Sequence, residues 1–130
     1  AQEEGPTSRE CVLVVDDARS IRDFITEYIL APRGFEILTA TDGLEGLRLA
    51  FDKQPDLMIV DVQMPNMDGL EMLRRLQLRR ITIPAILITA HSSEKVAIEA
   101  LRMGVRDYVL KPFDVKEMDE AIDRALREAD

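Results

Sequence analysis

Short apolar runs alternate with longer amphipathic stretches along most of the chain. The short runs cover residues 11–15, 35–39, 57–60, 85–88 and 108–110, and they are rich in β-branched residues. Continuous apolar runs of this length are typical of strands that are buried on both faces of a sheet. The pattern therefore predicts five buried strands.

The stretches between these strands have apolar residues three or four positions apart, which is the period of an amphipathic helix. In the first stretch the stripe consists of Ile21, Phe24, Ile25, Tyr28 and Ile29. The other stripes are Leu44/Leu47/Phe51, Leu70/Leu73/Leu76, Val96/Ala100/Leu101 and Val115/Met118/Ile122/Ala125. Gly and Pro residues mark several boundaries between these elements, namely Gly34, Pro55, Pro84 and Gly104.

A strand followed by a helix, repeated five times, predicts a (βα)5 fold. Strands joined by single helices must run parallel, because the helix supplies the crossover that a parallel pair needs. The expected architecture is a doubly wound α/β three-layer sandwich, in which ligands bind outside the carboxyl ends of the strands. We expect residues 1–10 to be a flexible leader and residues 11–130 to form the folded domain.

Charge and composition narrow the class of protein. The 17 Lys and Arg against 25 Asp and Glu give a net charge of −8, which argues against a domain that binds nucleic acid. The longest apolar run has five residues, far fewer than the roughly 20 that span a bilayer, so no membrane contact is expected. The single Cys cannot form an internal disulfide, which favours a cytoplasmic location.

Three acidic residues stand where predicted strands end. Asp16 and Asp17 follow the first strand, and Asp61 follows the third. Like charges about 4 Å apart repel by roughly 1 kcal/mol in water and about 4 kcal/mol at a dielectric of 20, so a shared cation is expected. Mg²⁺ suits such oxygen ligands and commonly binds phosphate as well. The alternative is that Asp16 and Asp17 only cap the first helix.

Two further strand ends add a hydroxyl and a cation. Thr89 ends the fourth strand and Lys111 follows the fifth, although each alone would be an ordinary strand or surface residue. Three carboxylates, one hydroxyl and one ammonium group at a single edge are the groups that phosphoryl transfer needs, with one carboxylate free to act as the nucleophile.

The order and spacing of these residues resemble the receiver domain of bacterial two-component response regulators. The successive spacings are 44 residues from Asp17 to Asp61, 28 to Thr89 and 22 to Lys111. The resemblance extends from residue 11 to about residue 128. The motifs that carry it are Val14-Val15-Asp16-Asp17, Asp61-Val62-Gln63-Met64-Pro65-Asn66-Met67-Asp68-Gly69, Thr89-Ala90 and Lys111-Pro112-Phe113.

The resemblance implies a flavodoxin-like strand order of 2-1-3-4-5 and a phosphorylated Asp61. Asp61 would accept the phosphoryl group of a phosphohistidine from a sensor histidine kinase or phosphotransfer protein. Asp16, Asp17, Asp61 and the backbone carbonyl of Gln63 would hold Mg²⁺. The domain would catalyse only its own phosphorylation and slow dephosphorylation, so it would not be an enzyme that acts on other substrates.

The remaining roles implied by the resemblance concern the other strand ends. Lys111, next to a cis peptide bond with Pro112, and the backbone of Ala90 would contact the phosphoryl group. Thr89 would move inward to it, with Tyr108 as the switching aromatic. His91 and Gln63 would occupy positions that tune the phosphoryl lifetime.

The switch would act through residues 93–128, roughly the fourth helix, fifth strand and fifth helix. That face would control an effector domain in the same chain or a separate partner, and a homodimer is compatible with it. Two alternatives stay open on the sequence alone, namely a Mg²⁺-dependent small-molecule phosphohydrolase and a binding-only pseudo-receiver. Against the phosphohydrolase, this sequence has no second acid two residues after Asp61. Against the pseudo-receiver, such proteins generally lose an acid, the Thr or the Lys, and this sequence retains all of them.

Overall fold

Five parallel strands form one sheet in the order β2-β1-β3-β4-β5. The computed structural model describes residues 9–91 and 93–128, so most of the predicted leader, residues 1–8, lies outside the described residues. The strands are β1 (Cys11–Val15), β2 (Glu36–Ala40), β3 (Leu57–Asp61), β4 (Ala85–Thr89) and β5 (Asp107–Leu110). The predicted α/β fold and the strand order implied by the resemblance are therefore confirmed.

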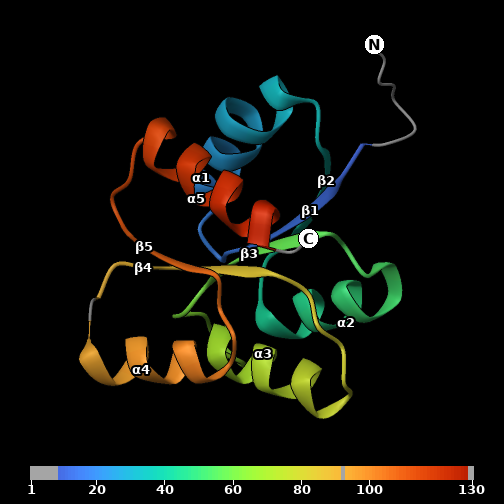
Figure 1. Ribbon diagram of the computed structural model, residues 1–130, viewed down its shortest axis with the longest axis vertical. Coiled ribbons are helices and arrows are strands. Elements are labelled where there is room, and N and C mark those ends of the chain that lie inside the picture. Colours follow the sequence, from blue (N-terminus) through green and yellow to red (C-terminus); the bar gives the residue numbers. More distant parts are fainter. Residues whose placement is uncertain (1–8, 92, 129–130) are drawn as a thin grey trace.

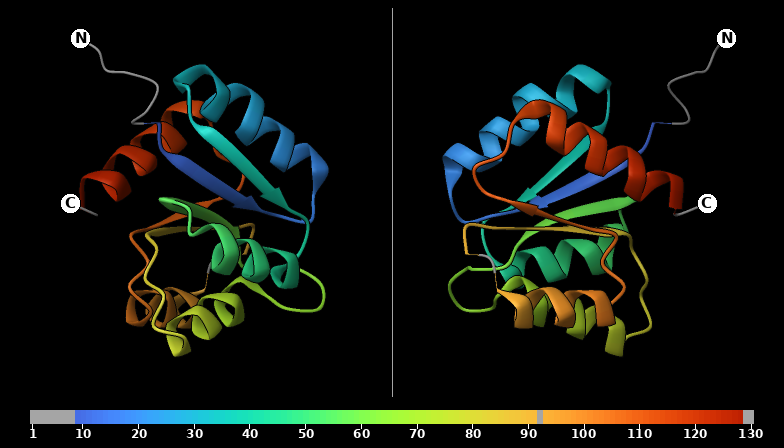
Figure 2. Two further views of the ribbon diagram at one scale, coloured as in Figure 1. Left: turned by 90° about the vertical axis from the view of Figure 1, so that its right-hand side faces the viewer. Right: turned by 60° about the vertical axis from the view of Figure 1, so that its left-hand side comes forward.

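Helices cover both faces of this sheet (Figures 1 and 2). One face carries α1 (Arg19–Asp23), its continuation η2 (Phe24–Leu30) and α5 (Val115–Glu128), and the other carries α2 (Gly43–Lys53), α3 (Gly69–Leu78) and α4 (Glu94–Arg102). A short 3-10 helix, η3 (Ala31–Arg33), leads into β2. No helix in the described part of the chain is both long and apolar enough to cross a membrane.

The core has two halves because successive strand residues point to opposite faces of the sheet. Leu13 and Val15 pack into the cluster under α2 and α3, while Val12 and Val14 pack into the cluster under η2 and α5. All five residues of β3 are buried, as are all five of β4. The third strand and the strands beside it thus form a rigid support for residues at their carboxyl ends.

Side chains at the helix starts fix where several helices begin. Asp42, Asp68 and Ser93 accept hydrogen bonds from backbone N–H groups three residues later at α2, α3 and α4. At α5, Asp114 and Glu117 accept from each other's backbone N–H groups, which is a capping box. These caps set the connections between strands and helices that border the edge described below.

The predicted stripe of the first helix is wrong at one position. Ile25 and Ile29 are buried, but Tyr28 is 63% exposed and Leu30 is buried instead. The cause is that α1 continues as the π-helix η2, whose i→i+5 hydrogen bonds change the helical period from Phe24 onward. A stripe drawn with the α-helical period therefore falls out of phase with the sheet.

Candidate functional site

Three carboxylates meet at the carboxyl edge of the sheet. Asp16 directly follows β1 and Asp61 is the last residue of the neighbouring strand β3. One carboxylate oxygen from each of Asp16, Asp17 and Asp61 lies within 4.8 Å of the other two. Asp16 is fully buried and Asp61 is 3% exposed, whereas Asp17 is open to solvent. The structure thus brings together the three acids that the strand pattern placed at one edge.

Lys111 holds the two buried acids of this cluster. Its Nζ lies 3.0 Å from Asp16 Oδ2 and 3.2 Å from Asp61 Oδ2. The residue follows β5, and its peptide bond to Pro112 is cis. Its backbone N–H donates to the carbonyl of Thr89 over 2.7 Å, which ties the end of β5 to the end of β4. The ammonium group therefore comes from a strand two positions from β3, which carries Asp61, and three positions from β1, which precedes Asp16.

Backbone N–H groups donate to the second carboxylate oxygen of Asp16 and of Asp61. Ala18 N–H donates to Asp16 Oδ1 over 2.8 Å, and Gln63 N–H donates to Asp61 Oδ1 over 3.2 Å. Asp16 Oδ2 makes no hydrogen bond within the described chain apart from its ion pair with Lys111. Helix capping does not account for Asp17, because the N-cap residue of α1 is Ala18 and the helix start has no side-chain cap. The cluster thus keeps oxygen atoms that are not used by the fold.

The cluster carries an excess of negative charge. Three ionised carboxylates and one ammonium group sum to −3 + 1 = −2. Burial and the Asp16 charge raise the pKa of the Asp61 carboxyl, against the opposing effect of Lys111. Burial tends to lower the pKa of Lys111, but the contacts with Asp16 and Asp61 outweigh it and raise that pKa. Lys111 therefore stays charged, and the site favours a further cation.

Thr89 and its neighbours complete the edge on the β4 side. Thr89 is fully buried, and its hydroxyl is engaged by the backbone of His91. It donates to the His91 carbonyl over 3.2 Å and accepts from the His91 N–H over 3.1 Å. Ala90 and the His91 side chain are exposed, as is Gln63 on the loop after β3. The Thr89 hydroxyl is held by this turn and makes no hydrogen bond to the carboxylates.

Tyr108 lies on β5, opposite Leu87 of β4 and packed against the core cluster under α2 and α3. Its hydroxyl is buried and has no hydrogen-bond partner in the described part of the chain. A buried hydroxyl without a partner costs roughly 1–3 kcal/mol. The Tyr108 side chain therefore occupies a position in which no described residue satisfies its hydroxyl.

Comparison with known proteins places this arrangement in a family. The family model for the response regulator receiver domain matches residues 12–123. The chain belongs to that family. The predicted resemblance is thereby confirmed over nearly the whole described domain.

Two curated relatives of this receiver domain are named as regulatory proteins and are longer than the matched region. Regulatory protein AtoC of Escherichia coli K12 is 39% identical over 89% of this chain and 25% of its own length. The alkaline phosphatase synthesis transcriptional regulatory protein PhoP of Bacillus subtilis is 34% identical over 92% of this chain and 49% of its own length. The chain thus spans between a quarter and a half of these curated relatives.

A solved structure shows the same fold in a receiver domain of similar size. The CheY-like response regulator receiver domain protein of Methanospirillum hungatei superposes with a TM-score of 0.86 and 30% identity. The match covers 94% of this chain and 97% of that one. Fold and family are therefore shared along the whole receiver domain.

Two residues near the acids of the receiver domain were given no role of their own in the sequence analysis. A Cβ at Gly69 would lie 2.4 Å from the backbone carbonyl oxygen of Asp61, so this position admits only glycine without displacing the end of β3. Arg22 donates from a guanidinium nitrogen to the Asp16 carbonyl oxygen over 2.8 Å. Gly69 was visible only as a turn former, and nothing in the sequence pattern pairs Arg22 with Asp16.

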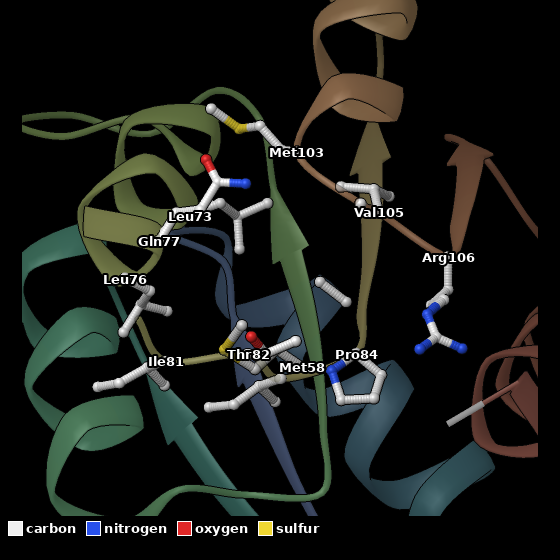
Figure 3. Close-up of a pocket in the computed structure, with 13 residues that line it drawn as sticks. Met58, Leu73, Leu76, Gln77, Ile81, Thr82, Pro84, Met103, Val105 and Arg106 are labelled. Carbon is white, nitrogen blue, oxygen red and sulfur yellow. The ribbon is translucent and has the colours of Figure 1, made fainter. Parts of the chain in front are cut away.

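A cavity of about 300 Å³ opens at the opposite edge of the sheet in the receiver domain (Figure 3). Side chains from α3, from the 81–84 connection and from the 103–106 connection surround it. Its lining contains no acidic residue and is mostly apolar. It lies away from the carboxylates and adds no group to their chemistry.

Proposed function

We propose that Asp61 is the phosphoacceptor of this receiver domain. The supporting observation is a buried carboxylate at the end of β3 that is ion-paired with Lys111 and flanked by two further acids. An Asp61 oxygen attacks the phosphorus of a phosphohistidine, and a new O–P bond forms as the P–N bond breaks. The electron pair of that bond leaves on the imidazole nitrogen. The donor is a sensor histidine kinase or a phosphotransfer protein.

The acids also fit Mg²⁺. The cluster offers oxygen ligands only, among them the buried Asp16 Oδ2, whose one partner in the described chain is the Lys111 ammonium group. Such ligands suit a hard divalent cation. We propose that Asp16, Asp17, Asp61 and the Gln63 carbonyl hold the ion. When bound, Mg²⁺ neutralises charge on the carboxylates and on the phosphoryl oxygens.

A stability measurement tests this metal site. We expect Mg²⁺ to raise the melting temperature, because a ligand that binds only the folded state at 100 times its Kd stabilises it by about 2.7 kcal/mol. Asp17→Asn removes the solvent-exposed acid of the cluster and should abolish most of that shift. Asp42→Asn keeps a capping side chain at α2 and should show the wild-type shift. An equal shift in the Asp17 variant would refute the ligand assignment.

The other residues at the edge would stabilise or tune the phosphorylated state. Lys111 would pair with the phosphoryl oxygens as it now pairs with the acids, and the backbone N–H of Ala90 would donate to them. Gln63 and His91 expose their side chains on the two loops that border the acids, a position from which they would control water access. We propose that these two residues set the phosphoryl lifetime, which exchange of either side chain should change in a dephosphorylation assay.

We propose that Thr89 and Tyr108 transmit phosphorylation to the face formed by α4, β5 and α5. A phosphoryl group adds charge and acceptor oxygens that attract a hydroxyl donor. Among the described residues, the Thr89 hydroxyl is held by the His91 backbone alone, and it would have to rotate to reach the phosphoryl group. The Tyr108 hydroxyl, which has no hydrogen-bond partner among the described residues, would be free to change its position. The two side chains lie on adjacent strands, so one change would bias the other.

Thr89→Ala should allow phosphorylation but prevent its transmission to the face formed by α4, β5 and α5. We expect the variant to accept a phosphoryl group, while the backbone NMR shifts that phosphorylation causes in β5 and α4 are largely lost. Thr82→Ala changes an exposed threonine before β4 and should leave those shifts as in the wild type. Full shifts in phosphorylated Thr89→Ala would show that Thr89 does not transmit the signal.

The output of the switch would be an effector domain in the same protein, a separate partner or a homodimer formed through that face. AtoC and PhoP are both named as regulatory proteins and extend well beyond the matched region. We propose a cytoplasmic setting, where a sensor histidine kinase would supply the phosphoryl group. The direct test of the whole proposal is phosphorylation by a small phosphodonor, with Asp61 as the modified residue.

A further inference from the structure

Helices α2 and α3 leave an apolar groove open between them. Leu44 and Phe51 of α2 are 51% and 46% exposed, and Leu78 of α3 is 78% exposed. Together with Leu47 and Leu76, these side chains line a hollow of about 390 Å³. The predicted apolar stripe of α2 is therefore only partly covered by the sheet, and the remainder faces this groove.

The groove is positively charged although the chain is acidic. Arg48, Arg75 and Arg79 line it together with Glu71, which gives +3 − 1 = +2 against a net charge of −8 for the whole chain. Arg75 pairs with Glu71 over 3.0 Å. Arg79 lies over the Phe51 ring, 5.2 Å from its centroid, and Arg48 has no hydrogen bond or ion pair to any described residue.

We propose that this α2–α3 groove binds an acidic amphipathic helix of a partner protein. Leu44, Leu47 and Phe51 follow one another at helical spacing along α2 and form one wall of the hollow. A groove between two helices accepts the apolar side chains of a third helix, as in other helix-in-groove complexes. Carboxylates beside those apolar residues would meet the guanidinium groups of Arg48 and Arg79, which supplies orientation and specificity.

A second copy of this chain is a poorer occupant. The exposed Ile98 and Leu101 of α4 lie on a helix whose two acids and two bases cancel. Helix α5 is more acidic, but its apolar residues are buried or partly buried against its own sheet. Among the described helices α1 to α5, none therefore combines strongly exposed large apolar residues with net negative charge. A flat anionic membrane would contact the rim residues but would not fill the hollow.

The groove lies outside the phosphorylation machinery. None of its lining residues belongs to the acid cluster, and none makes a hydrogen bond or ion pair with Lys111 or with the Thr89 hydroxyl. Binding there should therefore be constitutive. It would recruit a partner independently of Asp61, whereas the α4–β5–α5 face would respond to phosphorylation.

The test uses two synthetic helix-forming peptides with Leu and Phe at i, i+3, i+4 and i+7. One peptide carries Glu at the flanking positions and the other carries Lys. By fluorescence anisotropy we expect the acidic peptide alone to bind, with backbone NMR shifts confined to α2 and α3. Arg48→Glu and Leu78→Ser should each weaken binding about tenfold, because each removes a contact worth about 1.4 kcal/mol.

Two controls separate this proposal from its rivals and from the proposed function. Tyr28→Ser changes an exposed aromatic residue on the opposite layer and should bind like the wild type. Asp61→Asn should also bind normally, so loss of phosphorylation would leave this result intact. Equal binding of the Lys peptide, or shifts outside α2 and α3, would overturn the proposal. A dimer that is seen by sedimentation velocity and abolished by Leu78→Ser would also overturn it. So would binding to phosphatidylglycerol vesicles, instead of the peptide, that depends on Leu78.

Discussion

Asp61→Asn is expected to abolish phosphorylation completely. Incubated with Mg²⁺ and acetyl phosphate, the wild-type chain should gain the mass of one phosphoryl group, stable in acid and labile to hydroxylamine. The amide in the variant would have no anionic oxygen to form the O–P bond, while its size would keep the packing at the end of β3. Intact-mass spectrometry measures the gain, and peptide mapping identifies the residue.

A second acid on the same loop is the matched control. Asp68 is exposed and caps α3 by accepting a hydrogen bond from Glu71 N–H, a role that Asn performs equally well. Asp68→Asn should therefore gain one phosphoryl group like the wild type. No mass gain in the wild type would sink the switch proposal and favour a binding-only protein. Steady release of phosphate from many esters, without a phosphoprotein, would instead indicate a phosphohydrolase.

The central strands β1, β3 and β4 were predictable because they are buried on both faces. Residues 57–60 and 85–88 have no polar position that would be solvated in a sheet covered by helices, and both lie within observed strands. The second strand was placed one residue early, since it begins at Glu36 and ends at Ala40. Its edge position exposes Glu36 and Thr39, which weakens the apolar signal at its ends.

The helix surfaces were less predictable than the strands. Periodicity alone assigned Tyr28 and Leu101 to buried stripes, but these side chains are 63% and 73% exposed. Tyr28 leaves the stripe because of the π-helix, which depends on backbone hydrogen bonds that the sequence period does not reveal. In α4 only Ala100 is completely buried, and Leu101 faces solvent. Helical periodicity alone reveals neither of these departures.

The site was predictable wherever it depends on strand ends. Parallel strands place their carboxyl ends at one edge, so Asp16 and Asp61 had to be neighbours once β1 and β3 were adjacent. The contacts made by Lys111 with both acids depend on its rotamer and on the path of the chain after β5. The close approach of Gly69 to Asp61 depends on how the loop folds back. Such contacts follow only from three-dimensional packing.

Lys111→Met is expected to slow phosphorylation by about a hundredfold, the usual effect of removing one group that stabilises developing charge in a transition state. Methionine keeps much of the aliphatic volume, so the fold should persist. Among the described residues, Lys111 supplies the only cation that pairs with the carboxylate oxygens of Asp16 and Asp61, and the substitution removes it. Rates with acetyl phosphate and saturating Mg²⁺ measure the effect. Lys95 lies on α4 beside the loop that follows β3 and has no ion pair with the acids. Lys95→Met should therefore react at the wild-type rate.

The pH dependence of that variant distinguishes an electrostatic role from a structural one. Lys111 opposes the effects of burial and of Asp16 on the pKa of Asp61, so its loss should raise that pKa further. The nucleophile is the ionised carboxylate, which a raised pKa makes scarcer at low pH and restores as the pH rises. The rate of Lys111→Met should therefore keep increasing with pH beyond the point where the wild-type rate levels off. Parallel pH profiles would mean that Lys111 does not govern the charge of Asp61, and its role would then be confined to positioning the loop after β5.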